Sequence, residues 1–213
     1  MSTQSSHRPK RREAATEERR AAILDAALQE FAEKGFAGAR LDDVAKRAGV
    51  AKGTIYLLAK DKNDLLQQIV LGKLSPLLER LAALPALERA TLDEFRALMT
   101  FFNSEVMHSN RKLVAQLVIK EAGRFPDLAE FYYREVVTKV LAFAGAAAER
   151  ARAEGLLRSD AYARFPQLII APLLFSLIWD ANFSKLAPLD VAGLLAAHFE
   201  ALFDAPLTEE TRK

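Results

Sequence analysis

Residues 41–58 carry a spacing of small, apolar and glycine residues that few local structures can satisfy. Counting Leu41 as the first position, Ala45 is the fifth and Gly49 the ninth. The fourth, eighth, tenth, fifteenth and eighteenth positions are apolar: Val44, Ala48, Val50, Ile55 and Leu58. Two short helices that cross steeply need a small residue where they approach and a glycine in the turn. The segment therefore predicts a helix-turn-helix, with the turn at Gly49.

The remainder of the chain has the pattern of helices and no pattern of strands. Alanine and leucine dominate, and apolar residues recur with the helical period on either side of 41–58. The fold class is therefore predicted as all-α, with about nine helices. Besides the two helices of the turn motif, their expected ranges are 16–34, 62–84, 91–108, 111–122, 127–154, 161–184 and 190–203.

Charge and composition divide the chain into three parts. Residues 1–15 are polar and basic and are predicted to be a disordered arm. Residues 16–62 are predicted to form a small helix-turn-helix DNA-binding domain, and residues 63–213 a larger helical domain. Residues 1–62 hold 13 lysines and arginines against nine aspartates and glutamates, although the whole chain has a net charge of only +2. A basic first third favours a nucleic-acid partner.

The second helix of the motif leaves side chains facing outward that suit a DNA groove. Such a helix places its N-terminal part against base edges. Lys52 and Thr54 offer donors, Tyr56 offers a hydroxyl, and Gly53 lets the backbone approach closely. Lys60 and Lys62 lie where the next helix begins, and its free N–H groups favour a phosphate. The alternative is two short bundle helices with solvated lysines, and the basic arm and flanking helices favour the first interpretation.

With these residues in place, the sequence resembles the tetracycline-repressor (TetR) family of transcriptional regulators. The resemblance covers about residues 16–66. The matching residues are Ile23-Leu24-x-x-Ala27, Phe31-x-x-x-Gly35-Phe36, Val44-Ala45-x-x-Ala48-Gly49-Val50-x-Lys52-Gly53-Thr54-Ile55-Tyr56 and Lys62-x-x-Leu65. A weaker likeness, to the sensor domain of some efflux-regulating members, lies in Glu121-Ala-Gly-Arg-Phe-Pro-Asp-Leu.

The resemblance implies a homodimer that binds a palindromic double-stranded DNA operator and is released from it by a small-molecule effector. Lys52, Thr54, Tyr56 and Lys62 are the DNA contacts that it implies. The sequence departs from the family pattern at Leu58 and Ala59, where a phosphate-contacting side chain and a packing aromatic are usual. It departs again at Arg40 and Ala51, which stand where a serine or threonine often caps each short helix, and Arg40 is expected to contact a phosphate instead.

The last two expected helices are apolar on more than one face, so each must be buried on more than one face. One explanation is a four-helix bundle across a two-fold axis. The other is that both helices lie in the core of one protomer, and the resemblance favours the dimer. The residues expected at the dimer interface are Leu174, Phe175, Ile178, Leu195, His198, Phe199 and Leu202.

Aromatic residues and methionines concentrate in the middle of the larger domain, with a few polar groups among them. Ligand pockets have mostly apolar walls and few polar groups. A site for a small, largely apolar effector is expected here, although most of these side chains also suit a plain core. The candidate ligand-binding residues are Phe102, Asn103, Met107, His108, Glu121, Arg124, Phe125, Tyr132 and Trp179.

Several classes of function have no support in the sequence. The chain has no cysteine and three widely separated histidines, and it shows no glycine-rich phosphate loop. We therefore expect no catalytic residues, no metal, no cofactor and no enzyme. The longest apolar run is too short to span a membrane, so a cytoplasmic, nucleoid-associated protein is expected. The alternative function is a helical small-molecule sensor or adaptor with weakened or lost DNA binding.

Overall fold

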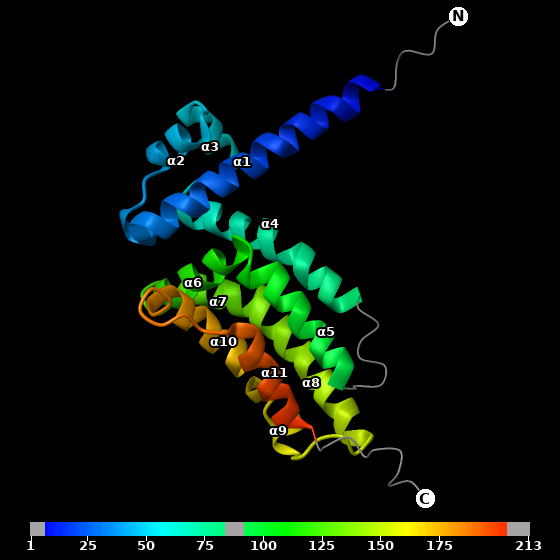
Figure 1. Ribbon diagram of the computed structural model, residues 1–213. Coiled ribbons are helices and arrows are strands. Elements are labelled where there is room, and N and C mark those ends of the chain that lie inside the picture. The colour runs from blue at the N-terminus through cyan, green and yellow to red at the C-terminus, as the bar shows by residue number, and fades with distance from the viewer. Residues whose placement is uncertain (1–6, 84–91, 204–213) are drawn as a thin grey trace, which may run out of the picture. The chain divides into compact units, whose positions relative to one another are not determined.

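The computed structural model describes residues 7–83 and 92–203, and every regular element in these ranges is a helix (Figure 1). The expectation of an all-α fold is confirmed. Two of the elements are π-helical turns. In chain order the elements are α1 (His7–Gly38), α2 (Leu41–Ala48), α3 (Lys52–Leu58), α4 (Lys62–Ala83), α5 (Leu92–Phe102), η1 (Asn103–Met107), α6 (Arg111–Glu121), α7 (Pro126–Tyr132), η2 (Tyr133–Val137), α8 (Thr138–Ala153), α9 (Ala161–Arg164), α10 (Gln167–Asn182) and α11 (Val191–Leu202).

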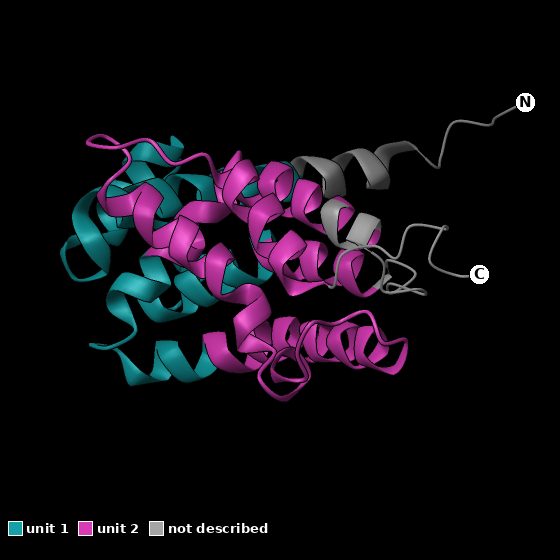
Figure 2. Cartoon of the chain, turned by 60° about the horizontal axis from the view of Figure 1, so that its bottom comes forward, with its two compact units in different colours: residues 1–73, 117–131 teal, residues 74–116, 132–213 magenta. Residues whose placement is uncertain are grey.

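The chain divides into two compact units, shown in teal and magenta in Figure 2. Unit 1 comprises residues 1–73 and 117–131, and unit 2 comprises residues 74–116 and 132–213. The sequence places a single boundary after residue 62, so the division differs in two ways. The first part of α4 packs within unit 1, because Leu65, Leu66 and Ile69 are fully buried. A segment from the middle of the chain also belongs to unit 1.

The core of unit 1 follows from the amphipathic pattern of α1. Leu28 and Phe31 lie on one face of this helix and are fully buried, and Ile23 is nearly so. Val44 of α2 and Ile55 of α3 are likewise fully buried. The inward positions of the turn motif therefore join α2 and α3 to the core that α1 and α4 provide.

Helix α1 is longer than the expected 16–34. It begins at His7, so residues 7–15, which we expected to be disordered, have a helical backbone. Alanine, arginine and glutamate are good helix formers, and here they extend a helix that packing already stabilises. At the other end the helix is interrupted at Gly35, whose φ of 72° and ψ of 163° are not helical. Residues 1–6 lie outside the described part of the chain.

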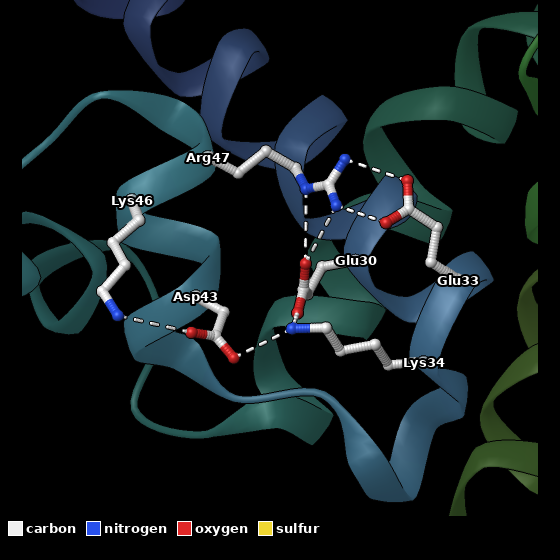
Figure 3. A network of polar contacts seen from close by, with 6 residues as sticks. All are labelled: Glu30, Glu33, Lys34, Asp43, Lys46 and Arg47. Carbon is white, nitrogen blue, oxygen red and sulfur yellow. Dashed lines mark hydrogen bonds and ion pairs between the residues drawn. The ribbon is translucent and has the colours of Figure 1, made fainter.

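A network of charged side chains joins α1 to α2 (Figure 3). Arg47 of α2 donates to Glu30 (Nε–Oε2, 3.3 Å) and to Glu33 (Nη1–Oε1, 3.0 Å). Lys34 of α1 pairs with Glu30 and with Asp43 (Nζ–Oδ2, 3.0 Å). Glu30 is almost completely buried, so Arg47 and Lys34 compensate a carboxylate that would otherwise be costly to desolvate.

The core of unit 2 is formed by side chains of α5, α8, α10 and α11. Leu195, Phe199 and Leu202 of α11 lie in this core together with Ile169 and Ala148. The sequence assigns these three residues of α11 to a dimer interface, but all three side chains are buried within the protomer. The reason is that α11 packs its apolar stripe on α5 and α10 of its own chain.

Three expected helices are interrupted. The range 91–108 becomes α5 and η1, and 127–154 becomes α7, η2 and α8. In the range 161–184, α9 ends at Arg164 and α10 begins at Gln167, because Pro166 has no N–H to continue the first helix. Periodicity alone does not reveal such interruptions, since apolar residues keep nearly the same spacing across them.

Candidate functional site

The turn between α2 and α3 has the geometry that its glycine predicts. Gly49 adopts φ 66° and ψ 31° in the left-handed region, and the N–H of Val50 donates to the carbonyl of Ala45 at 3.0 Å. Val44, Ala45 and Ile55 are buried. The apolar residues fix the crossing of the two helices, and the remaining face of α3 is left to solvent.

The outer face of α3 is built from Lys52, Gly53, Tyr56 and Leu57. All four residues are exposed, and a Cβ added to Gly53 would meet no atom within 4 Å. Thr54 is half-buried. Because Gly53 leaves the backbone open, a flat polar surface can approach this helix closely.

Lys52 is held by a carboxylate that the sequence interpretation did not single out. Its Nζ lies 2.8 Å from Oδ1 of Asp42 and 5.9 Å from the centroid of the Tyr56 ring. The hydrogen bond with Asp42 raises the pKa of Lys52. Lys52 is thus a fixed, charged group on an exposed face. The two residues come from different helices, so no periodicity within α2 or α3 could have revealed the pair.

The other expected DNA contacts differ in their surroundings. Arg40 is exposed and precedes α2 with an extended backbone and no side-chain cap. Lys60 is exposed, and its N–H donates to Asp64. Lys62 points inward instead, because its Nζ donates to the carbonyls of Phe36 (2.8 Å) and Ala37 (2.9 Å). In this structure Lys62 caps the end of α1.

The two departures from the family pattern occupy packing positions. Ala59 is buried, and the carbonyl of Leu58 accepts a hydrogen bond of 2.6 Å from Nε2 of Gln68. The end of α3 is therefore tied to α4 without the usual aromatic side chain.

The candidate effector residues of unit 2 include one unsatisfied polar atom. Oδ1 of Asn103 is buried and has no hydrogen-bond partner within the described residues. Met107 is buried and Phe102 packs against two apolar clusters, whereas His108 is exposed and its Nδ1 bonds the carbonyl of Asn103. Burial raises the pKa of Tyr132 to about 12, so its phenol stays protonated.

The remaining candidate effector residues lie elsewhere. Glu121, Arg124 and Phe125 belong to unit 1, where Oε1 of Glu121 accepts a hydrogen bond from the N–H of Phe36. Trp179 lies on α10, between Phe175 and Phe183, and its Nε1 donates to the carbonyl of Ala187 at 2.7 Å. The structure therefore does not bring all nine candidates into one unit.

Helix α10 presents large apolar side chains to solvent. Leu174, Phe175 and Ile178, all expected at a dimer interface, are 46%, 47% and 38% exposed. His198 of α11 is half-buried, and its Nε2 has no partner within the described residues. Contiguous exposed apolar residues mark an interaction surface more often than a random surface.

Residues 7–83 and 92–203 offer neither a metal site nor a membrane-spanning helix. In that part of the chain, no group of three or more histidine, cysteine, aspartate or glutamate side chains could hold a metal ion. None of the helices in those ranges is both long and apolar enough to cross a membrane.

Comparison with known proteins identifies relatives of the turn motif and of the whole helical fold. The family profile "Bacterial regulatory proteins, tetR family" matches residues 23–69. The chain is 35% identical over 103 residues to the fatty acid metabolism regulator protein of Bacillus subtilis, covering 47% of this chain and 53% of that protein. It is 34% identical over 119 residues to the transcriptional regulator AcrR of Shigella flexneri, covering 53% and 54%.

These two alignments span about half the length of the curated relatives. Over a larger part of the chain, the fold is similar to that of FadR from Bacillus subtilis, solved in complex with stearoyl-CoA. The TM-score is 0.69 with 26% identity, and the match covers 84% of this chain and 95% of the other. The relatives are transcriptional regulators, which agrees with the expectation that the chain is not an enzyme.

Proposed function

Because the chain belongs to the tetR family of bacterial regulatory proteins, we propose that it is a homodimeric regulator that represses transcription from a palindromic operator and is released by an apolar effector. The observation that carries the proposal is the outer face of α3, which follows a left-handed glycine turn and presents Lys52, Gly53 and Tyr56 to solvent. A helix of this kind enters the major groove.

In the proposed complex Lys52 exchanges partners. The carboxylate of Asp42 holds the ammonium group in free protein, and a DNA phosphate or base acceptor takes its place on binding. The carboxylate of Asp42 would then be repelled by the DNA phosphates. This repulsion would help to set how deeply α3 enters the groove. Thr54 and Tyr56 supply hydroxyl donors, and Arg40 and Lys60 supply positive charge on either side of the motif.

The dimer is proposed to form through α10. Leu174, Phe175 and Ile178 expose apolar surface that a second copy of the same helix would cover about a two-fold axis. Leu195, Phe199 and Leu202 are already buried within the protomer, so the interface is proposed without them. His198 of α11 is half-buried and stays a candidate interface residue.

The effector is proposed to carry a long apolar chain, as a long-chain acyl-CoA does. FadR of Bacillus subtilis, which this chain resembles in fold, was solved with stearoyl-CoA. In unit 2 of this chain, Asn103 offers a buried and unsatisfied acceptor at the first residue of a π-helical turn. Such turns occur frequently at functional sites. Phe102 and Met107 supply apolar surface beside it, and Tyr132 supplies a hydroxyl donor.

The test is selection of bound duplexes from a random library. We expect the wild-type protein to enrich a palindrome, and K52A/Y56A to lose that enrichment. The matched control is K139A/Y133A, which removes an exposed lysine and an exposed tyrosine from unit 2. The affinity of the wild-type protein for the selected duplex should fall steeply as the salt concentration rises. In a plot of the logarithm of the binding constant against the logarithm of the salt concentration, each phosphate contact that a substitution removes should make the slope smaller by about one.

Stearoyl-CoA and free CoA are then added to the protein–duplex complex. If stearoyl-CoA releases the protein from the duplex and free CoA does not, the result supports an acyl-CoA effector. If neither compound releases the protein, that effector class is rejected, but the DNA-binding function is not affected. If the folded wild-type protein enriches no duplex, the regulator proposal fails and the sensor or adaptor function replaces it.

A further inference from the structure

A buried carboxylate lies at the last residue of α6. Glu121 is only 2% exposed, and its Oε1 accepts a hydrogen bond of 3.3 Å from the backbone N–H of Phe36. Its Oε2 is buried without a hydrogen-bond partner within the described residues, and the exposed guanidinium of Arg124 stays 4.0 Å away. A buried and incompletely satisfied carboxylate is costly, so its position calls for a role other than packing.

The backbone opposite Glu121 is shaped to receive the carboxylate. Gly35 has a φ of +72°, and a Cβ added there would lie 3.2 Å from Oε1 of Glu121. A side chain at this position would be both strained and crowded. Beside the hydrogen bond, the rings of Phe36 and Phe125 meet edge to face with centroids 4.8 Å apart. Segment 117–131 thus holds one residue, Phe36, through a polar and an aromatic contact.

Phe36 is also held by α4. Lys62 donates to the carbonyls of Phe36 and Ala37, and its Nζ lies 5.3 Å from the centroid of the Phe36 ring. Residues 35–39, which we name the α1–α2 corner, end two residues before α2 begins at Leu41. The corner therefore fixes the start of the helix-turn-helix.

The chain passes between the two units at residues 73/74, 116/117 and 131/132. The first passage lies inside α4, where Pro76 has no N–H to donate to the carbonyl of Gly72. That helix lacks a hydrogen bond just where it leaves unit 1. The other two passages bracket segment 117–131, whose first residues are the C-terminal half of α6. Segment 117–131 contacts unit 1 through Phe36, although the chain on either side of the segment belongs to unit 2.

We propose that Glu121 is a positioning residue that holds the α1–α2 corner through the N–H of Phe36 and thereby sets the orientation of α2 and α3 for DNA. Without this carboxylate the N–H of Phe36 loses its acceptor, and the contacts with Lys62 and Phe125 remain. The DNA-related part of this inference rests on the proposed function, whereas the attachment itself does not.

The test compares E121A, E121Q and E130A in the full-length protein. Glu130 is an exposed carboxylate of the same segment and serves as the matched control. We expect E121A to speed hydrogen exchange of the Phe36 amide and of α2, while α1 around Leu28 keeps its wild-type protection. E121Q, whose amide oxygen still accepts from Phe36, and E130A should exchange like wild type. F125L, which trims the second contact, should act on the same amides and is informative even if E121A does not fold.

On the duplex selected by wild-type protein, E121A should bind more weakly by roughly 5–150-fold, the usual range for coupled sites. E121Q should stay within about threefold of wild type. Unchanged exchange at Phe36 in E121A, equal damage by E121Q, or loss of protection throughout unit 1 would overturn the proposal. If wild-type protein selects no duplex, the proposed function has failed, and the exchange pattern alone then decides whether Glu121 holds the corner.

Discussion

His198 of α11 lies against a stretch of α10 that contains a proline. Pro172 lies inside α10 and has no N–H, so the carbonyl of Leu168, one turn earlier, lacks its usual intrahelical donor. His198 of α11 forms a hydrogen bond with the backbone of Leu168. Its Nε2 is buried without a partner in the described part of the chain.

The stability of the protein should depend on the protonation of His198. Burial lowers the pKa of His198 below its ordinary 6.5, and the bond with Leu168 offsets this only in part. The unfolded chain therefore binds more protons than the folded one between the folded pKa and 6.5. The contribution of His198 to folding is complete above pH 6.5 and declines as the pH falls toward the folded pKa.

H198N keeps a donor near Leu168 and cannot titrate, so it should lack this part of the pH dependence. Denaturant unfolding of both proteins between pH 7.5 and about pH 5 measures the difference. Subtracting one curve from the other removes the contribution of the other histidines. Parallel curves would contradict the assigned pKa shift.

The attachment of α2 to α1 depends on ion pairs as well as on apolar contacts. Glu30 is buried between Arg47 and Lys34, and Asp43 joins Lys34 from the side of α2. The hydrogen bond from Lys34 lowers the pKa of Asp43. Short helices such as α2 are not stable alone, so contacts of this kind decide where α2 lies.

R47A should destabilise the protein more than other charge deletions on α2. It removes a guanidinium that bonds the buried Glu30, and leaving a buried charged group short of a partner costs about 1–3 kcal/mol. The matched control is K46A, because Lys46 is 81% exposed and makes one ion pair of 3.7 Å. Its loss should cost less than about 1 kcal/mol.

Urea unfolding of R47A, K46A, E30Q and R47A/E30Q measures both effects. In the double variant the cost of R47A should shrink, because the carboxylate that needs compensation is gone. An equal cost of R47A in both backgrounds would show that Glu30 is not its essential partner.

At the scale of the whole molecule, neither the proposed dimerisation nor the division into units can be explained by a single helix. Residues 117–131 belong to the same unit as the helix-turn-helix, although they lie far from it in the chain. The exposed residues of α10 belong to the other unit. The apolar face of α10 and the attachment through Phe36 are therefore separate features that mutation can address independently.

F175D/I178D should convert the proposed dimer into monomers. The two substitutions place charges in the centre of the exposed apolar face of α10, where a partner would have to desolvate them without compensation. L57D is the matched control, since Leu57 of α3 is 90% exposed but lies in unit 1. Sedimentation velocity of the three proteins gives the answer. A dimeric F175D/I178D would place the interface elsewhere.

Local spacing was sufficient to predict the helix-turn-helix. Ala45, Gly49 and Ile55 act through neighbours within about ten residues, so their order along the chain nearly fixes the crossing of α2 and α3. The helical class followed in the same way, since it depends on composition and on a period of 3.6 residues. The breaks at Pro166 and at the π-helical turns were missed, because the apolar period continues across them.

Only the tertiary structure shows which residues pair with the buried polar groups. It alone also shows which apolar residues lie in the core and which lie on the surface. Glu121 meets Phe36 across 85 residues of sequence, and Lys62, expected at a phosphate, turns inward to the same residue. On α11, whose apolar residues cover a wide face, the pattern could not say whether Leu195 and Phe199 face their own chain or a second copy. Periodicity indicates that a face is buried, but what buries it depends on long-range packing, which places helices distant in sequence against one another.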